Sequence, residues 1–87
     1  MKAVVTVIGK DMVGILAKVA TTCAEANANV LEVTQSVLQE YFAMVMLIDI
    51  TEINTDLVEL TKALEKSVTD MKIHVMHEDI FNSMHRI

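Results

Sequence analysis

The stretch from Phe42 to Ile50 constrains the fold most, because it is apolar on both of its alternating faces. One face would carry Phe42, Met44, Met46 and Ile48, and the other Ala43, Val45 and Leu47. A strand of this kind must be covered on both sides, so we predict a central strand over 42–50. The chain has 87 residues, which is enough for one hydrophobic core, and we expect residues 1–87 to form a single domain.

The residues before this stretch predict two strands and a helix. Residues 2–8 are rich in β-branched side chains and end at Gly9, which is typical of a buried strand. An amphipathic helix is predicted from Ile15, with apolar side chains at positions 15, 16, 19, 20, 23 and 24. Asn27 and Asn29 are poor helix formers and should end it. Residues 30–39 predict the next strand, with a bulge between Val30 and Val33.

The residues after this stretch predict a second helix, a strand and a short terminal helix. Glu40 and Tyr41 should form the reversal into the central strand. Asn54, Thr55 and Asp56 are candidate N-caps for a helix that starts at 57 and ends between 67 and 70. Residues 71–77 predict the last strand, and residues 78–86 predict a short helix with acidic side chains first and basic ones last.

This order of elements, βαββαβ, predicts an α+β fold. We expect a ferredoxin-like sandwich, a four-stranded antiparallel sheet with two helices on one face, plus a short C-terminal helix. The second face of the sheet would otherwise expose more apolar area than a monomer tolerates. A partner subunit or the terminal helix, with Ile80, Phe81 and Met84, should cover it. In so short a chain we also expect a homodimer.

Composition excludes several classes of partner. The net charge is −5 and aromatic residues make up 3%, so neither phosphate neutralisation nor base stacking is supported, and we expect no nucleic acid. Charged residues interrupt every apolar run well before the ~18 residues of a membrane helix, so we expect no membrane partner. The single cysteine, Cys23, and an N-terminus without signal-peptide features favour the cytoplasm.

The segment from Gly9 to Ile15 is the candidate binding loop. The N–H groups of Val13, Gly14 and Ile15 should lie at a helix N-terminus, where an anion is favoured, and Asp11 carries a carboxylate that can pair with an ammonium. This arrangement suits a zwitterion. The alternative is purely structural: Asp11 caps the helix and the two glycines permit turns.

Four segments of the sequence resemble the ACT domain family, and within it the small, free-standing, UPF0237-like members. They are Lys-Ala-Val-Val-Thr-Val at 2–7, Gly-Lys-Asp-Met-Val-Gly-Ile-Leu-Ala at 9–17, Asn-Val-Leu-Glu-Val-Thr-Gln at 29–35 and Tyr-Phe-Ala-Met at 41–44. The resemblance covers essentially all 87 residues. It implies the βαββαβ fold and a ligand such as an amino acid, bound at a subunit interface.

The resemblance also implies which residues bind the ligand. Asp11 and Gly14 carry over from the loop after the first strand, with Met12, Val13 and Ile15 beside them, and Asn29 carries over from the head of the second strand. We expect no attached enzymatic domain, and the resemblance does not say which target this module regulates. We expect a non-enzymatic regulatory protein without a cofactor.

Other candidate sites have simpler structural explanations. Cys23 falls on the apolar stripe of its helix, as a packed core thiol would. His74 and His77 precede Glu78 and Asp79, but side chains three apart on a strand point to opposite faces, so we expect no metal site. The methionines at 44, 46, 71, 76 and 84 are more typical of core or interface filling than of a soft-metal site.

Enzymes and carriers that share this topology need residues that the chain lacks in the first loop. An acylphosphatase-type enzyme would want an arginine there, whereas the only arginine is Arg86. A metal carrier would show Cys-x-x-Cys, and an RNA binder would need aromatics on its central strands. The remaining alternative to a ligand sensor is a protein–protein interaction module without a small ligand.

Overall fold

The computed structural model describes residues 1–10 and 14–84 and has the predicted order of elements. The strands are β1 (Lys2–Gly9), β2 (Asn29–Leu38), β3 (Tyr41–Asp49) and β4 (Lys72–His77); the helices are α1 (Ile15–Glu25), α2 (Leu57–Ser67) and α3 (Glu78–Met84). The ferredoxin-like βαββαβ arrangement with a short C-terminal helix is therefore confirmed.

The four strands form one antiparallel sheet in the order β2-β3-β1-β4. β3 is an interior strand, as its two apolar faces predict, and β2 and β4 are the edges. The register between β2 and β3 shifts between Val30 and Glu32, which confirms the predicted bulge.

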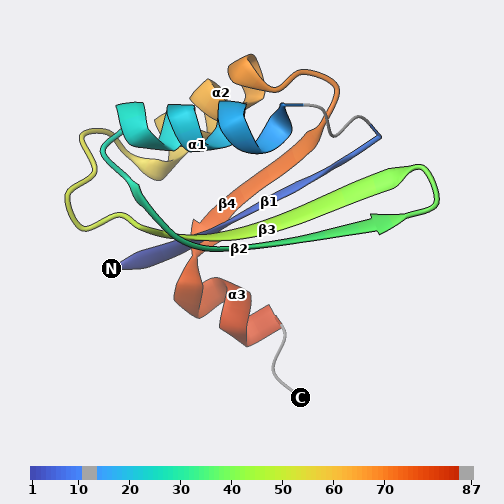
Figure 1. Cartoon of the computed structure of the whole chain (residues 1–87). Helices are drawn as coiled ribbons and strands as arrows, with labels where there is room; N and C mark the ends of the chain where they lie inside the picture. The colour runs from blue at the N-terminus through green and yellow to red at the C-terminus, as the bar shows by residue number, and fades with distance from the viewer. Residues whose placement is uncertain (11–13, 85–87) are drawn as a thin grey trace.

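Two layers and a separate terminal helix make up the molecule (Figure 1). α1 and α2 lie side by side on one face of the sheet, and α3 lies beneath the opposite face. The helix-facing side chains of β1 and β3, among them Val5, Met44 and Met46, are fully buried against Val19 and Leu64 of the two helices. This confirms that the methionines at 44 and 46 fill the core.

The opposite face of the sheet is covered only in part. α3 contacts β1 and β4, so the terminal helix supplies part of the predicted cover. Ile8, on the same face of β1 as Val4, still has 47% of its surface exposed. Part of this face is therefore exposed and can contact a ligand or another protein chain.

Element ends differ from the predictions by one or two residues where the backbone turns left-handed. Gln39 has φ 57°, so the reversal occupies residues 39–40 and Tyr41 already belongs to β3. Asn27 has φ 62° just after α1, whereas Asn29, expected to break the helix, begins β2. The predicted extension of α3 to Arg86 lies outside the described residues.

The helices in the described part of the chain are short, with 11 residues in α1, 11 in α2 and 7 in α3. None of those within residues 1–10 and 14–84 is long and apolar enough to cross a membrane.

Candidate ligand site at the start of α1

Gly14 sets the start of α1 and gives it an open N-terminus. Its φ of 71° is in the left-handed region, and as the N-cap residue it makes no side-chain cap. The first helical hydrogen bond runs from Lys18 N to Gly14 O over 3.0 Å. The N–H groups of Ile15 and the next two residues therefore point out of the helix end, where an anion is favoured.

In the structure, the N–H groups of the first turn start at Ile15, later in the chain than the predicted set. The prediction named the N–H groups of Val13, Gly14 and Ile15, whereas the helix itself begins at Ile15. Asp11, Met12 and Val13 lie outside the described residues. Gly14 and Ile15 are thus the two loop residues that the structure brings together at the helix end.

A cavity of about 280 Å³ lies beside the first turn of α1. Its lining comes from both sides of the fold: Lys10, Ile15, Lys18, Val68, Thr69, Asp70 and Met71. Ile15 is buried, whereas Lys18 and Asp70 are exposed and can bring charge of either sign to the rim. The cavity is therefore large enough and polar enough for a small zwitterion.

Sequence reasoning missed the residues of this cavity outside the loop. Lys18 could have been found, because it lies four residues after Gly14 and so on the same side of the helix. Thr69 and Asp70 carry no such signal. They reach the cavity because β4 lies next to β1 in the sheet, which brings the connection before β4 to the end of β1.

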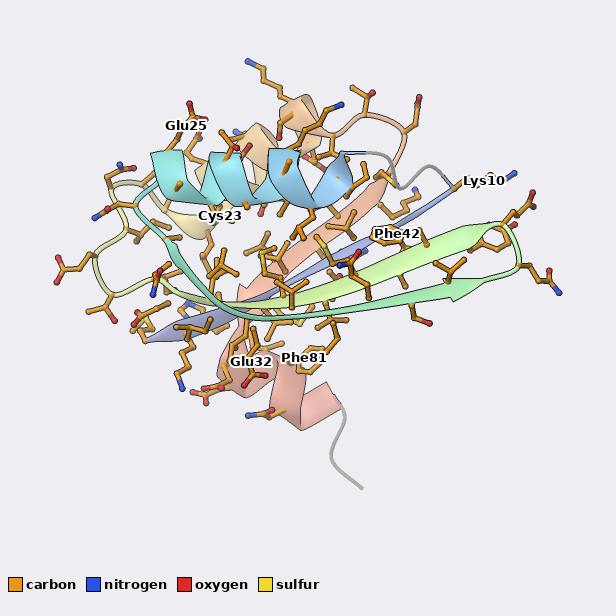
Figure 2. All side chains as sticks on the ribbon, viewed as in Figure 1. Lys10, Cys23, Glu25, Glu32, Phe42 and Phe81 are labelled. Carbon is orange, nitrogen blue, oxygen red and sulfur yellow. The ribbon has the colours of Figure 1, made fainter. Side chains whose placement is uncertain are left out.

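Lys10 directs its ammonium toward the β2–β3 turn. Its Nζ lies 3.8 Å from Glu40 Oε1 and 5.8 Å from the centre of the Tyr41 ring, and Figure 2 shows Lys10 at this end of the sheet. Both members of the ion pair are largely exposed, so the pair holds Lys10 only weakly. It can turn toward a bound anion at little cost.

Asn29 lies at the far end of the sheet from this cavity. It pairs with Asp49 of β3, and Asp49 in turn pairs with Lys2, the first residue of β1. Gly9, which leads to the loop, is the last residue of β1, so the two ends are separated by roughly 23 Å. One protomer alone does not bring Asn29 and Gly14 together.

The remaining candidates occupy the places that their simpler explanations require. Cys23 is fully buried, and this burial raises the pKa of its thiol to about 11, which opposes the thiolate that a nucleophile needs. His74 pairs with Thr6 and His77 with Ala3, so the two imidazoles are on opposite faces of the sheet. Within the described residues, no three metal-binding side chains gather.

Three comparisons relate this geometry to known proteins. The family model described as ACT domain matches residues 2–78. A UPF0237 protein of Methanocaldococcus jannaschii is 44% identical over 88 residues, covering 99% of this chain and 98% of that protein. The ACT domain protein from Streptococcus pneumoniae is 34% identical, with a TM-score of 0.77 and 98% of each chain covered.

A fourth similarity concerns a regulator. A putative glycine cleavage system transcriptional repressor has a TM-score of 0.69 and 26% identity, with 85% of this chain and 43% of that chain covered. Most of this chain thus corresponds to less than half of that protein.

Proposed function

Because the chain belongs to the ACT domain family, we propose that it is a regulatory module that binds a small amino acid between two copies of itself and catalyses no reaction. The observation that carries this proposal is the open N-terminus of α1 at Gly14, beside a cavity of about 280 Å³. Its similarity to a putative glycine cleavage repressor supports a small amino acid as the ligand. We place the module in the cytoplasm, where free amino acids are sensed.

A homodimer formed through β2 would complete the site. β2 is an edge strand, and α1 contacts it. If two copies pair their β2 strands antiparallel about a two-fold axis, Asn29 of the partner subunit comes to the Leu38 end of this strand. Gly9 and the start of α1 are at that same end of the sheet, because Phe42 and Tyr41 pair with Gly9 and Leu38. The separation along the strands is thereby removed, and the Asn29 of the partner subunit is then three strand spacings, about 14 Å, from Gly9.

Each charged group of the ligand would bind a different part of this site. The ligand carboxylate accepts hydrogen bonds from the N–H groups of the first turn of α1, within reach of the Lys18 ammonium. The ligand ammonium pairs with Asp11 of the loop, where Met12 and Val13 flank the ligand. The Asn29 amide of the partner subunit, both donor and acceptor, fixes the orientation.

A thermal-shift screen against the twenty amino acids, followed by calorimetry, tests this proposal. A ligand at about 100 times its dissociation constant should stabilise the protein by about 2.7 kcal/mol. Asp11→Asn should then weaken binding tenfold to a hundredfold, because one charge-assisted bond is worth about 1.5–3 kcal/mol. Gly14→Val should weaken it more, since the new side chain enters the space of the ligand and opposes the positive φ.

The alternative function, a protein-interaction module, gives a different outcome. In that case none of the twenty amino acids shifts the melting temperature. If a ligand is found but binds Asp11→Asn, Gly14→Val and Asn29→Ala as tightly as the wild type, the site lies elsewhere.

A further inference from the structure

A second hollow, on the opposite face of the sheet from α1, has a lining unlike that of the first. It measures about 340 Å³ and lies between the sheet and α3. Figure 2 shows Phe81 of α3 directly under the strands. The hollow is walled mainly by apolar side chains of β1, β3, β4 and α3, namely Ile8, Ala43, Val45, Met76 and Phe81. At this size it suits a small molecule with an apolar body.

Two neighbouring polar side chains interrupt this apolar lining. Thr6 and His74 are direct cross-strand partners and both line the hollow. Within the described residues, neither side chain makes a hydrogen bond to another protein group. A hydroxyl and an imidazole at neighbouring positions can together hold two oxygens of one ligand group.

Charges of both signs lie around the hollow: Glu32 lies near Phe81 (Figure 2), and Lys72 lies nearer the Thr6–His74 pair. Lys72 is the cross-strand partner of Ile8 and lies two residues from His74, so it is on the same face of β4. No carboxylate is among the lining residues that the structure describes. An anionic group is therefore favoured at the Thr6–His74 pair, and a cationic one is disfavoured.

We propose that this hollow binds a small apolar carboxylate, such as an arylalkanoic or short-chain fatty acid. The carboxylate accepts hydrogen bonds from Thr6 and His74 near the Lys72 ammonium, and the apolar body lies between Val45 and Phe81. An amino acid fits less well, because its ammonium finds no acceptor carboxylate in this lining. The site lies on the other face of the sheet from the amino-acid site and does not depend on it.

A second copy of the chain seated on this face is the competing occupant. A second copy that covered the Thr6–His74 pair with apolar side chains would leave both polar groups without hydrogen bonds, which costs free energy that a carboxylate ligand does not. The small acid is therefore the occupant that the lining favours.

Calorimetry with 3-phenylpropanoate tests the proposal, with 3-phenylpropanamide as the probe of equal shape and no charge. We expect the acid to bind the wild type at least tenfold more tightly than the amide. His74→Leu should remove most of this preference. Ala43→Leu should abolish binding of both probes by filling the hollow, whereas the matched substitution Ala63→Leu, at an exposed position of α2, should leave binding unchanged.

Light scattering on the same variants measures the molecular mass and so distinguishes a small carboxylate in the hollow from a second copy of the chain on this face. Retained mass in Ala43→Leu together with lost binding supports the proposal. A halved mass in that variant makes this face a subunit interface and overturns it. Equal affinity for acid and amide, or no binding of either, overturns it as well. None of these results bears on the amino-acid site, whose own test uses Asp11, Gly14 and Asn29.

Discussion

The two glycines of the chain are required for different physical reasons. At Gly14 the requirement is conformational, because φ is 71° and a Cβ added there would meet no atom of the described residues within 4 Å. At Gly9 it is steric and weaker, because an added Cβ would overlap Met71 Sδ, the end of a flexible side chain that can move aside. Gly14 therefore leaves free space beside the helix end, whereas Gly9 allows close contact between the end of β1 and the connection before β4.

We predict that Gly14→Ala lowers the free energy of unfolding by about 1–2 kcal/mol, from the backbone alone. Gly14→Asn should cost less, since asparagine tolerates the left-handed region better. Urea denaturation of the three proteins measures the difference. An alanine variant as stable as the wild type would show that φ at position 14 is not held positive in solution.

We predict that the buried Cys23 thiol makes the free energy of unfolding fall at alkaline pH. Burial raises its pKa from 9.0 to about 11, so the unfolded chain loses this proton first as the pH rises. The corresponding stability is complete below pH 9 and should decline by up to about 3 kcal/mol toward pH 11. Cys23→Ala should lack this part of the decline, although the smaller side chain lowers its stability at neutral pH.

Urea denaturation of both proteins at pH 7, 9 and 10.5 gives the comparison. The stability gap between wild type and Cys23→Ala should narrow as the pH rises. A constant gap would contradict the raised pKa.

The two long helices, each an element of the same layer, begin in opposite ways. α2 is closed by Asp56, whose Oδ1 accepts from Glu59 N at 2.8 Å. α1 begins at a glycine that offers no such acceptor, and among residues 1–10 and 14–84 no side chain caps its first turn. The difference agrees with a ligand at α1 and with a purely structural role for the start of α2.

Asp56→Ala should therefore lower the free energy of unfolding by about 1 kcal/mol without changing amino-acid binding. Chemical denaturation and calorimetry check the two parts. Asp56→Asn, which keeps an acceptor oxygen, is the matched control and should retain most of the stability. Loss of ligand affinity in Asp56→Ala would contradict the assignment of the site to α1.

For the whole molecule, the open edge at β2 predicts the mode of assembly. We expect light scattering to report twice 9.7 kDa at micromolar concentration. Thr34 is exposed near the middle of β2, so in an antiparallel pair Thr34→Lys would bring two like charges together across the axis and should give the monomer mass.

Val58→Lys adds the same charge at an exposed position of α2 and should leave the dimer intact. A dimer of unchanged stability in Thr34→Lys would place the interface away from β2.

Much of the fold could be predicted because its signals are local. The apolar run of residues 42–50, the three-and-four spacing after Ile15 and the N-cap candidates at 54–56 are each signals within a few residues. The structure confirms an interior strand, now Tyr41–Asp49, and the helix from Ile15, and it selects Asp56 from the three cap candidates. Element ends were less certain because left-handed residues such as Gln39 carry only a weak sequence signal.

The candidate site was predictable only in part. Gly14 and Ile15 follow one another in the chain, so their presence at one helix end was evident from the sequence. That Asn29 lies at the opposite end of the sheet from Gly9 in one protomer, and that Thr69 and Asp70 reach the same cavity as Ile15, followed only from the pairing and order of the strands.

The sequence by itself determined the elements, the bulge and the family resemblance, because periodicity, capping and turn residues act over a few positions. Tertiary structure decided which distant segments meet: α3 under β1 and β4, Thr6 beside His74, and the connection before β4 at the end of β1. The reason is physical. Strand pairing joins residues far apart in the chain, and several sheet orders bury the same apolar faces equally well.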